Sequence, residues 1–249
     1  MLERISKKRL ISFLEEKIEV LSFSSLGSTN TSAKTLLLKG EQPPFLVIAN
    51  KQTKGRGRQG KSFYSKKNAG IYMTLAVDKD FVKTSAITAA AAVSVATAIR
   101  SQCSLDAKIK WVNDIYIEGK KVSGILSEAV KDSDNTLKGY IIGIGINTDI
   151  KKFPKDIEDI ATSLKVGNKN LLAATVINNL LIHLADEDNS FLNVYKEVSL
   201  CLGKEIIYIE NGKTKTAKAI DIDKDGGLVI EEDGSVKTLK GGEISLKLK

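Results

Sequence analysis

The chain has 249 residues, of which 42% are hydrophobic and 27% charged, so it can bury a sizeable core as one large domain or as a large and a small one. Its net charge of +8 is unevenly placed, because residues 1–67 hold 14 Lys and Arg against 5 Asp and Glu, whereas the remainder hold 24 against 25. This placement predicts a local site for an anionic ligand or an acidic partner, and argues against a generally adhesive surface. Nucleic acid stays among the candidate partners at this point.

The cysteine and hydropathy patterns indicate the cellular compartment of the protein. Cys103 and Cys201 lie in unrelated apolar contexts without disulfide or metal-ligand spacing, which predicts structural thiols in a reducing environment. Residues 1–21 interleave charged with apolar side chains and do not form the pattern of a signal peptide. No stretch approaches the roughly 20 apolar residues that span a membrane. We therefore expect a cytoplasmic protein without membrane association.

The predicted elements begin with apolar residues between Leu2 and Ile18, which indicate one amphipathic helix or two short ones. A short strand at Val20–Phe23 comes before a polar, glycine-containing stretch and a helix from about Ser32 to Lys39. Ser28 or Thr29 would be a natural N-cap for that helix. Two further strands are expected at Phe45–Asn50 and Ile71–Val77.

The middle of the chain predicts helices around an antiparallel meander. Thr84–Arg100 is an Ala- and Val-rich helix, capped by Thr84 or Ser85 and apolar nearly all round, which predicts that it is buried. Tight turns separate strands expected at Lys108–Trp111, Ile115–Glu118, Val122–Val130 and Tyr140–Ile146. Two more helices are expected, at Leu171–Asp186 and Phe191–Leu200.

From Gly203 onward the chain consists of short β-prone runs separated by glycine-containing turns, which predicts a small barrel. The expected strands are Glu205–Ile209, Lys215–Ile222, Leu228–Glu231, Val236–Leu239 and Ile244–Leu248. We place the domain boundary between Leu202 and Gly203, giving one domain at residues 1–202 and another at residues 203–249.

The most unusual stretch is Lys51–Lys67, which contains three glycines and seven basic residues and no carboxylate. Glycines let backbone N–H groups approach a ligand, and arginine grips carboxylate or phosphate with a two-pronged donor. The stretch fits both a phosphate-binding P-loop and a dinucleotide-binding pattern. Both patterns require a helix at the end of the loop, but Ser62–Gly70 shows turn residues and no helical period. On these residues alone, a P-loop, a dinucleotide site and a solvated basic loop all remain open.

Four other stretches carry unusual combinations of residues. Lys110–Asp114 places a lysine, an asparagine and a carboxylate at a strand end, although Asn-Asp is also a common turn pair. Lys121 follows a hairpin turn and leads into Gly124-Ile125-Leu126. Gly143 and Gly145 share one face of a strand, where glycine often marks the close approach of a ligand. Gly241–Leu246 reads G-G-E-I-S-L near the end of the chain.

In chain order these stretches, with S-T-N at Ser28–Asn30 and Q-T-x-G-R-G-R-x-G from Gln52, resemble the biotin–protein ligase family over nearly the whole chain from Ser28 onward. The resemblance explains why no helix follows the stretch Lys51–Lys67, which we call the glycine loop. It also removes the P-loop and dinucleotide interpretations. It implies an α/β (α+β) fold, with a mixed-sheet catalytic domain flanked by helices and related to class II aminoacyl-tRNA synthetases, followed by an SH3-like barrel. Some members also carry an N-terminal winged-helix repressor domain, for which Ser28 arrives too early here.

The family activates biotin with MgATP to biotinyl-adenylate and transfers it to a lysine of a carboxylase's biotin carboxyl carrier domain. The resemblance implies catalytic roles for Lys121, Arg58 and Asp114, with Asp114 orienting either Lys121 or Mg²⁺. It assigns biotin to Ser28, Thr29, Asn30, Gln52, Gly55, Arg56, Arg58, Lys121, Gly124, Gly143 and Gly145, the glycines leaving room for the rings. It assigns the nucleotide to Arg58, Lys61, Phe63, Lys110, Asn113 and Asn147.

The chain departs from the family pattern at three positions in the loop. Gln59 and Lys61 stand where arginine is common, and Phe63 stands where tryptophan is common. Lys61 keeps the charge but loses the planar fork, which predicts a looser grip on phosphate. Phe63 keeps an aromatic wall without the indole donor. The expected partner is the carrier domain, with a homodimer possible and no specific DNA binding.

Two alternative functions remain from the sequence. A lipoate–protein ligase would carry out the same class of reaction, although its relatives usually lack the G-R-G-R-x-G loop. A non-enzymatic nucleic-acid-binding module would need aromatic platforms among the basic residues, for which only Phe63 and Tyr64 qualify. The single histidine, His183, is expected to be structural, which argues against a His-dependent nucleophilic mechanism.

Overall fold

The structure, a computed structural model, describes residues 4–246. Its first half contains α1 (Lys7–Ile11), β1 (Glu19–Phe23), α2 (Thr29–Leu38), β2 (Phe45–Ala49), a short 3₁₀ turn at Arg58–Gly60, β3 (Gly70–Asp78), α3 (Ile87–Cys103), β4 (Lys108–Lys110) and β5 (Asp114–Ile117). Its second half contains β6 (Lys120–Lys131), β7 (Leu137–Asn147), α4 (Lys169–Ala185), α5 (Phe191–Glu197), β8 (Glu205–Glu210), β9 (Lys213–Ile222), β10 (Leu228–Glu232), β11 (Ser235–Leu239) and β12 (Ile244–Leu246).

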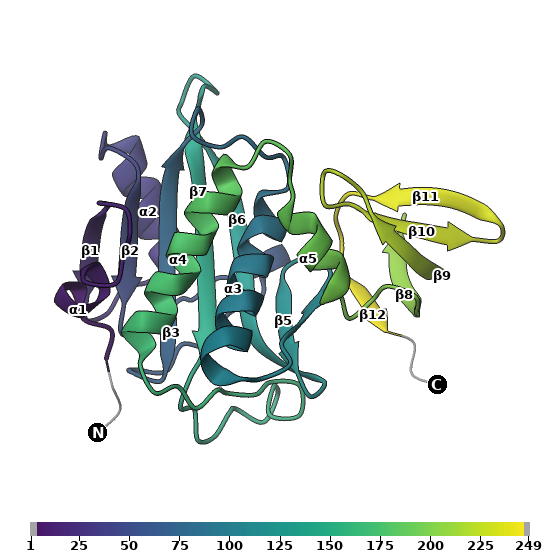
Figure 1. The fold of residues 1–249 in the computed structure, drawn as a ribbon, viewed down its shortest axis with the longest axis horizontal. Coiled ribbons are helices and arrows are strands. Elements are labelled where there is room, and N and C mark those ends of the chain that lie inside the picture. Colours follow the sequence, from purple (N-terminus) through teal and green to yellow (C-terminus); the bar gives the residue numbers. More distant parts are fainter. Residues whose placement is uncertain (1–3, 247–249) are drawn as a thin grey trace.

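A seven-stranded mixed sheet in the order β1-β2-β3-β7-β6-β5-β4 forms the centre of the larger part of the molecule. Only β1 and β2 run parallel, and every other neighbouring pair is antiparallel. Helices cover both faces, with α3 and α4 in front in Figure 1 and α2 behind. The sheet is therefore the middle layer of an α/β sandwich, as the sequence predicts.

Alternation along β2 explains how one sheet serves two helical layers, because successive side chains point to opposite faces. Phe45 and Val47 pack with Ala33 of α2, and Leu46 and Ile48 belong to the larger core that includes α3 and α4. The alanine-rich α3 is buried along most of its length, as its apolar sequence predicts. Small alanine side chains let this helix lie close to the sheet and to α4.

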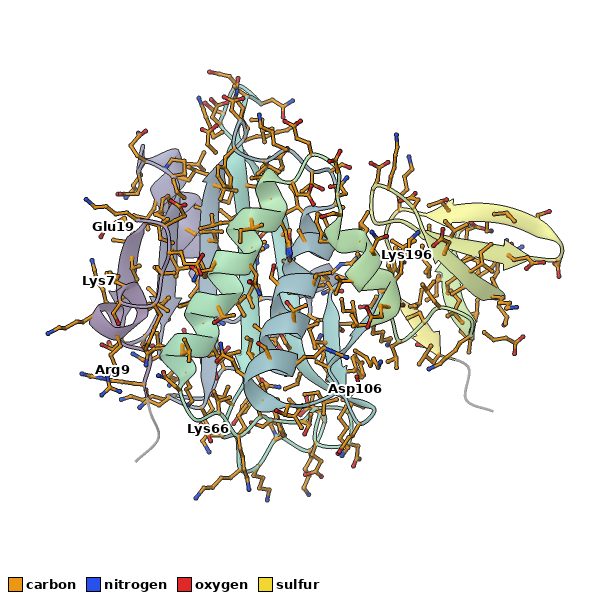
Figure 2. All side chains as sticks on the ribbon, viewed as in Figure 1. Lys7, Arg9, Glu19, Lys66, Asp106 and Lys196 are labelled. Atoms are coloured by element: carbon orange, nitrogen blue, oxygen red, sulfur yellow. The ribbon has the colours of Figure 1, made fainter. Side chains whose placement is uncertain are left out.

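The C-terminal strands form a separate antiparallel sheet in the order β11-β10-β9-β8-β12. Its edge strands, β11 and β12, do not pair with each other within residues 4–246, so the sheet is open there. Residues 247 and 248 of the last expected strand lie outside the described part of the chain. The sheet packs beside α5, where Lys196 contacts Asp221 of β9 at 2.8 Å (Figures 1 and 2). Trp111 adds a donor across this junction, with Nε1 3.0 Å from the Gly226 carbonyl.

The structure corrects three predicted helix starts. The opening helix is only five residues long, α1, in the described residues before β1. Helix α2 begins at Thr29, earlier than predicted, and Ser28 occupies the N-cap position without a side-chain capping bond. Helix α3 begins at Ile87, and the predicted cap Thr84 instead accepts a hydrogen bond from the Ala86 N–H at 2.9 Å. The Thr29 N–H at the start of α2 bonds to Gln52 of another segment, and the bond before α3 is local to Thr84 and Ala86.

No helix in the described residues is long and apolar enough to cross a membrane. Cys103 and Cys201 are free thiols. Burial raises the pKa of both thiols, which lowers the fraction of reactive thiolate at neutral pH. His183 is half-buried against Phe191, and its Nδ1 lies 3.0 Å from the Ser94 hydroxyl, which agrees with the structural role expected of it.

Candidate functional site

A strip of small residues on one face of the large sheet forms the floor of the site. Gly145 of β7 pairs with Gly124 of β6, and Gly143 pairs with Thr74 of β3. A cavity of about 400 Å³ opens over this strip. Because glycine has no side chain, other groups can approach the sheet more closely here than elsewhere on this face.

The structure brings the sequence-predicted site residues together in this cavity, with the exception of Gly55. The lining residues among them are Ser28, Thr29, Asn30, Gln52, Arg56, Arg58, Lys61, Phe63, Lys110, Asn113, Asp114, Lys121, Gly124, Gly143, Gly145 and Asn147. A side chain at Gly55 would meet the Phe63 carbonyl and, at 2.9 Å, the Ser65 hydroxyl. Its missing side chain therefore lets the glycine loop pack on itself.

The N-terminus of α2 forms the uncharged polar end of the cavity. Gln52 Oε1 accepts hydrogen bonds from the Thr29 N–H at 2.8 Å and from the Thr29 hydroxyl at 3.1 Å. The fully buried Thr74 hydroxyl lies 2.8 Å from both Thr29 Oγ1 and Asn30 Oδ1. The helix therefore starts at Thr29 because Gln52 satisfies an N–H that would otherwise lack a partner.

Glu128 connects this polar end to the glycine loop. Its carboxylate accepts hydrogen bonds from Asn30 Nδ2 at 3.0 Å and from the Arg56 guanidinium at 3.0 and 3.2 Å. Asn30 also donates to the Leu126 carbonyl at 3.1 Å. Buried polar side chains with fixed partners keep one geometry, so the cavity presents its hydrogen-bonding groups preorganised. The sequence alone did not indicate Thr74 or Glu128, which lie outside the recognisable motifs.

Side chains of the chain itself occupy the space above two of the floor glycines. A methyl group at Gly143 would collide with the Asn30 amide, and one at Gly145 would collide with the Phe63 ring. The resemblance predicted that these glycines leave room for ligand rings. In the structure they let Asn30 and Phe63 approach the sheet.

The glycine loop folds into a tight excursion without a following helix, as predicted. Gln59 and Gly60 both have positive φ, at 51° and 75°, so the second of these positions favours glycine. The loop closes through a bond from the Gly57 N–H to the Lys61 carbonyl at 2.7 Å. Arg58 at its tip donates to Asn113 Oδ1 at 3.2 Å, which joins the loop to the turn before β5.

Lys121 and Asp114 face each other across the β5–β6 pair. The Lys121 ammonium lies 2.7 Å from the Asp114 carboxylate, and both side chains are partly exposed to the cavity. Asp114 therefore contacts Lys121, and its role in orienting Lys121 or Mg²⁺ stays a prediction. A nearby cation, the Lys110 ammonium, lies 5.5 Å from the centre of the Tyr116 ring.

The C-terminal part of the chain contributes a carboxylate to the same site. Glu243, from the G-G-E-I-S-L motif, lies 2.7 Å from the Lys61 ammonium with both carboxylate oxygens. The bond from Lys61, with additional attraction from Arg58 and Lys110, holds the pKa of Glu243 below its usual range. Among the described residues the cavity is lined by five cationic side chains, Arg56, Arg58, Lys61, Lys110 and Lys121. The carboxylates of Asp114 and Glu243 line it as well, and that of Glu128 binds Arg56, so a net positive charge remains that favours an anionic ligand.

Sequence reasoning missed the segment that joins β7 to α4, which runs along the lower edge of the sheet in Figure 1. Phe153, Ile157 and Ile160 of this segment line the cavity, and Phe153 contacts Tyr64 of the glycine loop with ring centres 6.2 Å apart. Their spacing of four and three residues is a helical period that could have drawn attention to them. These side chains give the cavity an apolar wall next to Lys121, whose N–H donates to the Ile160 carbonyl at 2.8 Å.

The donor set does not form a protein-built metal site. No three His, Cys, Asp or Glu side chains gather closely enough to hold a metal ion in the part of the chain that is described. Asp114 and Glu243, the carboxylates of the cavity, both contact lysines.

Comparisons with known proteins identify the family of the chain. Residues 22–147 match the model of the biotin/lipoate A/B protein ligase family, and residues 201–247 match that of the biotin protein ligase C-terminal domain. The bifunctional ligase/repressor BirA of Bacillus subtilis is 32% identical over 234 residues, with 89% of this chain and 72% of that protein covered. The chain belongs to the biotin/lipoate A/B protein ligase family.

Within this family, the chain is similar to proteins named as biotin ligases. The biotin–[acetyl-CoA-carboxylase] ligase of Mycobacterium tuberculosis is 25% identical over 234 residues, with 88% of this chain and 85% of that protein covered. The biotin protein ligase of Aquifex aeolicus, solved in complex with biotin and ATP, superposes with a TM-score of 0.78 at 26% identity, with 93% of this chain and 99% of that chain covered. These matches favour a biotin ligase over a lipoate ligase.

Proposed function

We propose that this chain joins biotin to a lysine of a biotin carboxyl carrier domain in two ATP-dependent steps. In the first, a biotin carboxylate oxygen attacks the α-phosphorus of ATP, and the bond to pyrophosphate breaks. In the second, the amine of the carrier lysine attacks the acyl carbon of the adenylate, AMP leaves, and the amine loses a proton. The family membership supports the reaction class, and the cavity supports the roles given below.

The observation that carries the proposal is the polarity of the cavity. One end has uncharged hydrogen-bonding groups from Ser28, Thr29, Asn30 and Gln52, and the other has a surplus of cations. Biotin matches this arrangement, because it has a neutral ureido head and an anionic carboxylate at the end of its tail. The glycine floor lets the ligand approach the sheet once Phe63 yields space over Gly145.

Cations at the reacting end address the main obstacle to the first step, which is repulsion between the biotin carboxylate and the triphosphate. We assign Lys121 to the bridge between that carboxylate and the α-phosphate, where negative charge grows in the transition state. Asp114, 2.7 Å from Lys121, would hold its ammonium in place before the substrates arrive. Arg58 and Lys61 would bind the adenylate phosphate and the departing pyrophosphate, with Lys61 leaving Glu243 to do so.

The nucleotide enters as MgATP, so the metal ion is part of the substrate. It would neutralise phosphate charge, and Asp114 is the cavity carboxylate that could orient it. Lys110, Asn113, Asn147 and Phe63 would surround the rest of the nucleotide. The apolar wall of Phe153, Ile157 and Ile160 would then keep water from the reactive mixed anhydride.

Strand β6 of this chain has an unpaired edge beside the cavity, and we propose that the carrier domain docks there. Strand β5 pairs with β6 only as far as Gly124, while β6 continues to Lys131 without another strand on that side in the described residues. Ile125 lines the cavity, and Asn113 satisfies both its N–H and its carbonyl, so the edge without a partner strand lies beyond Ile125. An extended segment of the carrier placed along this edge would bring its lysine towards Lys121. A second copy of this chain could use the same edge to form a homodimer.

The remaining parts of the proposal rest on the family resemblance and on composition. We place the domain boundary at residues 202 and 203, just before the C-terminal sheet begins at Glu205. That sheet has the short antiparallel strands expected of an SH3-like barrel, and the larger sheet is expected to share ancestry with class II aminoacyl-tRNA synthetases. The free thiols of Cys103 and Cys201 support a cytoplasmic location.

An ATP–pyrophosphate exchange assay tests the proposal. The purified chain is given MgATP, labelled pyrophosphate and either biotin or lipoate, and incorporation of label into ATP is measured. Exchange that requires biotin is the expected result. Exchange supported by lipoate and not by biotin would assign the chain to the lipoate branch, and no exchange with either acid would contradict adenylate formation.

A further inference from the structure

A fully buried lysine connects the roots of the two loops that enclose the cavity. Lys169, the first residue of α4, has a side chain that is 1% exposed. Its ammonium donates to the Asn68 carbonyl at 2.7 Å and lies 3.1 Å from the Asp149 carboxylate. A buried charge is costly unless it is paired and hydrogen-bonded, so this lysine is held where its partners are.

Each partner lies at the end of a loop that lines the cavity. Asn68 directly follows the glycine loop and lies two residues before β3, whereas Asp149 lies two residues after β7 and opens the loop at residues 150–163. Both residues have the left-handed backbone conformation, with φ of 58° and 56°. Asn and Asp tolerate this conformation better than other non-glycine residues, and the contacts with Lys169 fix the two turns in place.

One backbone bond joins the same two roots directly, because the Thr148 N–H donates to the Ala69 carbonyl at 3.0 Å. The Asp149 N–H donates to the Leu164 carbonyl at 2.9 Å, which ties together the two ends of the β7–α4 loop. Farther out, the loops meet again where Tyr64 contacts Phe153. The segment that carries Lys66, labelled in Figure 2, and the β7–α4 loop both lie at the lower edge of the sheet. The loops therefore touch at their roots and above the cavity.

We propose that Lys169 is a positioning residue for the nucleotide half of the reaction, because its ammonium sets the spacing of the two loops. This inference rests on the proposed function. The polar end of the cavity has anchors of its own in the sheet, because Thr74 of β3 contacts Thr29 and Asn30, and Glu128 of β6 contacts Asn30. A substitution of Lys169 should therefore weaken the binding of ATP and of the adenylate much more than the binding of biotin.

The test compares wild type with the double variant Lys169→Met/Asp149→Asn, which removes both charges together and avoids stranding one of them. Lys169→Arg keeps the charge and should restore the wild-type behaviour in part. His183→Gln, on the same helix but bonded to Ser94, is the control for a general loss of stability. Trp111 is the single tryptophan and lines the cavity, so its fluorescence can follow binding in one titration with biotin and in another with ATP.

We expect the double variant to bind biotin within twofold of wild type and to have a KM for ATP raised roughly tenfold, the size of a typical coupling through packed elements. Amide hydrogen exchange without ligand should rise in both loops, at residues 55–64 and 150–163. Unchanged amide hydrogen exchange in either loop would overturn the inference. Equal losses of affinity for biotin and for ATP would overturn it as well. The hydrogen-exchange measurement needs no turnover, so it decides the role of Lys169 even if the enzyme assay contradicts the proposed function.

Discussion

Thr74→Val tests whether the buried network at the start of α2 prepares the biotin site. The substitution keeps the shape of a fully buried side chain and removes the hydroxyl that lies 2.8 Å from both Thr29 Oγ1 and Asn30 Oδ1. One hydroxyl has one proton, so it can donate fully to only one of these oxygens at a time, and the variant leaves that oxygen without its donor. Leaving a buried polar group without a partner costs about 1–3 kcal/mol.

If Thr29 and Asn30 contact the ligand, most of this loss should appear in biotin binding. Because each 1.4 kcal/mol is tenfold, about 1–3 kcal/mol corresponds to biotin binding weakened roughly 5- to 150-fold. Titration calorimetry with biotin measures the change directly, and Thr74→Ser should restore the affinity. Thr97→Val is the matched control, because Thr97 bonds within α3 to the Val93 carbonyl at 2.7 Å and does not line the cavity. Wild-type biotin affinity in a folded Thr74→Val protein would refute the argument.

Three further predictions follow from the site, the charge distribution and the single histidine. Arg58→Gly should release biotinyl-adenylate faster and increase biotin labelling of an unrelated lysine-rich protein on blots; equal labelling would show that Arg58 does not retain the intermediate. Burial lowers the pKa of His183 below its ordinary value near 6.5, so the unfolded chain binds the proton more readily and the free energy of unfolding should fall as pH drops from about 6.5 towards the folded pKa. Urea unfolding at about pH 7.5 and about pH 5.5 measures this, and a difference that persists unchanged in His183→Gln would contradict it. Mobility shifts should show only weak DNA binding that disappears with added salt, whereas one preferred sequence at physiological salt would argue for a repressor activity.

Much of the architecture could be predicted because the strands and long helices carry clear periodicity. β2, β3, β6 and β7 lie close to their expected ranges, and the buried character of α3 was evident from its alanines. The start of α2 was less predictable, because the Thr29 N–H takes its hydrogen-bond partner, Gln52, from another segment. Contacts of that kind depend on tertiary structure and leave no periodic signal.

The site could be predicted only where short motifs mark it. Arg58 stands out in a basic, glycine-rich stretch, and Lys121 is marked only by its match to a family motif, but Thr74 is an ordinary strand residue until the fold places it under α2. Glu128 reads as a solvated strand residue, although it contacts Asn30 and Arg56. The ion pair between Lys61 and Glu243 joins positions far apart in the sequence, so no local sequence pattern could predict it.

The central claim is that this cavity holds biotin and ATP together for adenylate formation, with Lys121 stabilising the charge that develops between them. Single-turnover formation of biotinyl-adenylate by wild type and Lys121→Ala tests it most directly, with the biotin affinity of each protein measured alongside. Loss of one preorganised donor at a developing charge typically costs about 10²- to 10³-fold, so we expect the variant to form adenylate that much more slowly while its biotin affinity changes far less. Near-wild-type adenylate formation by a variant that binds biotin normally would contradict the account.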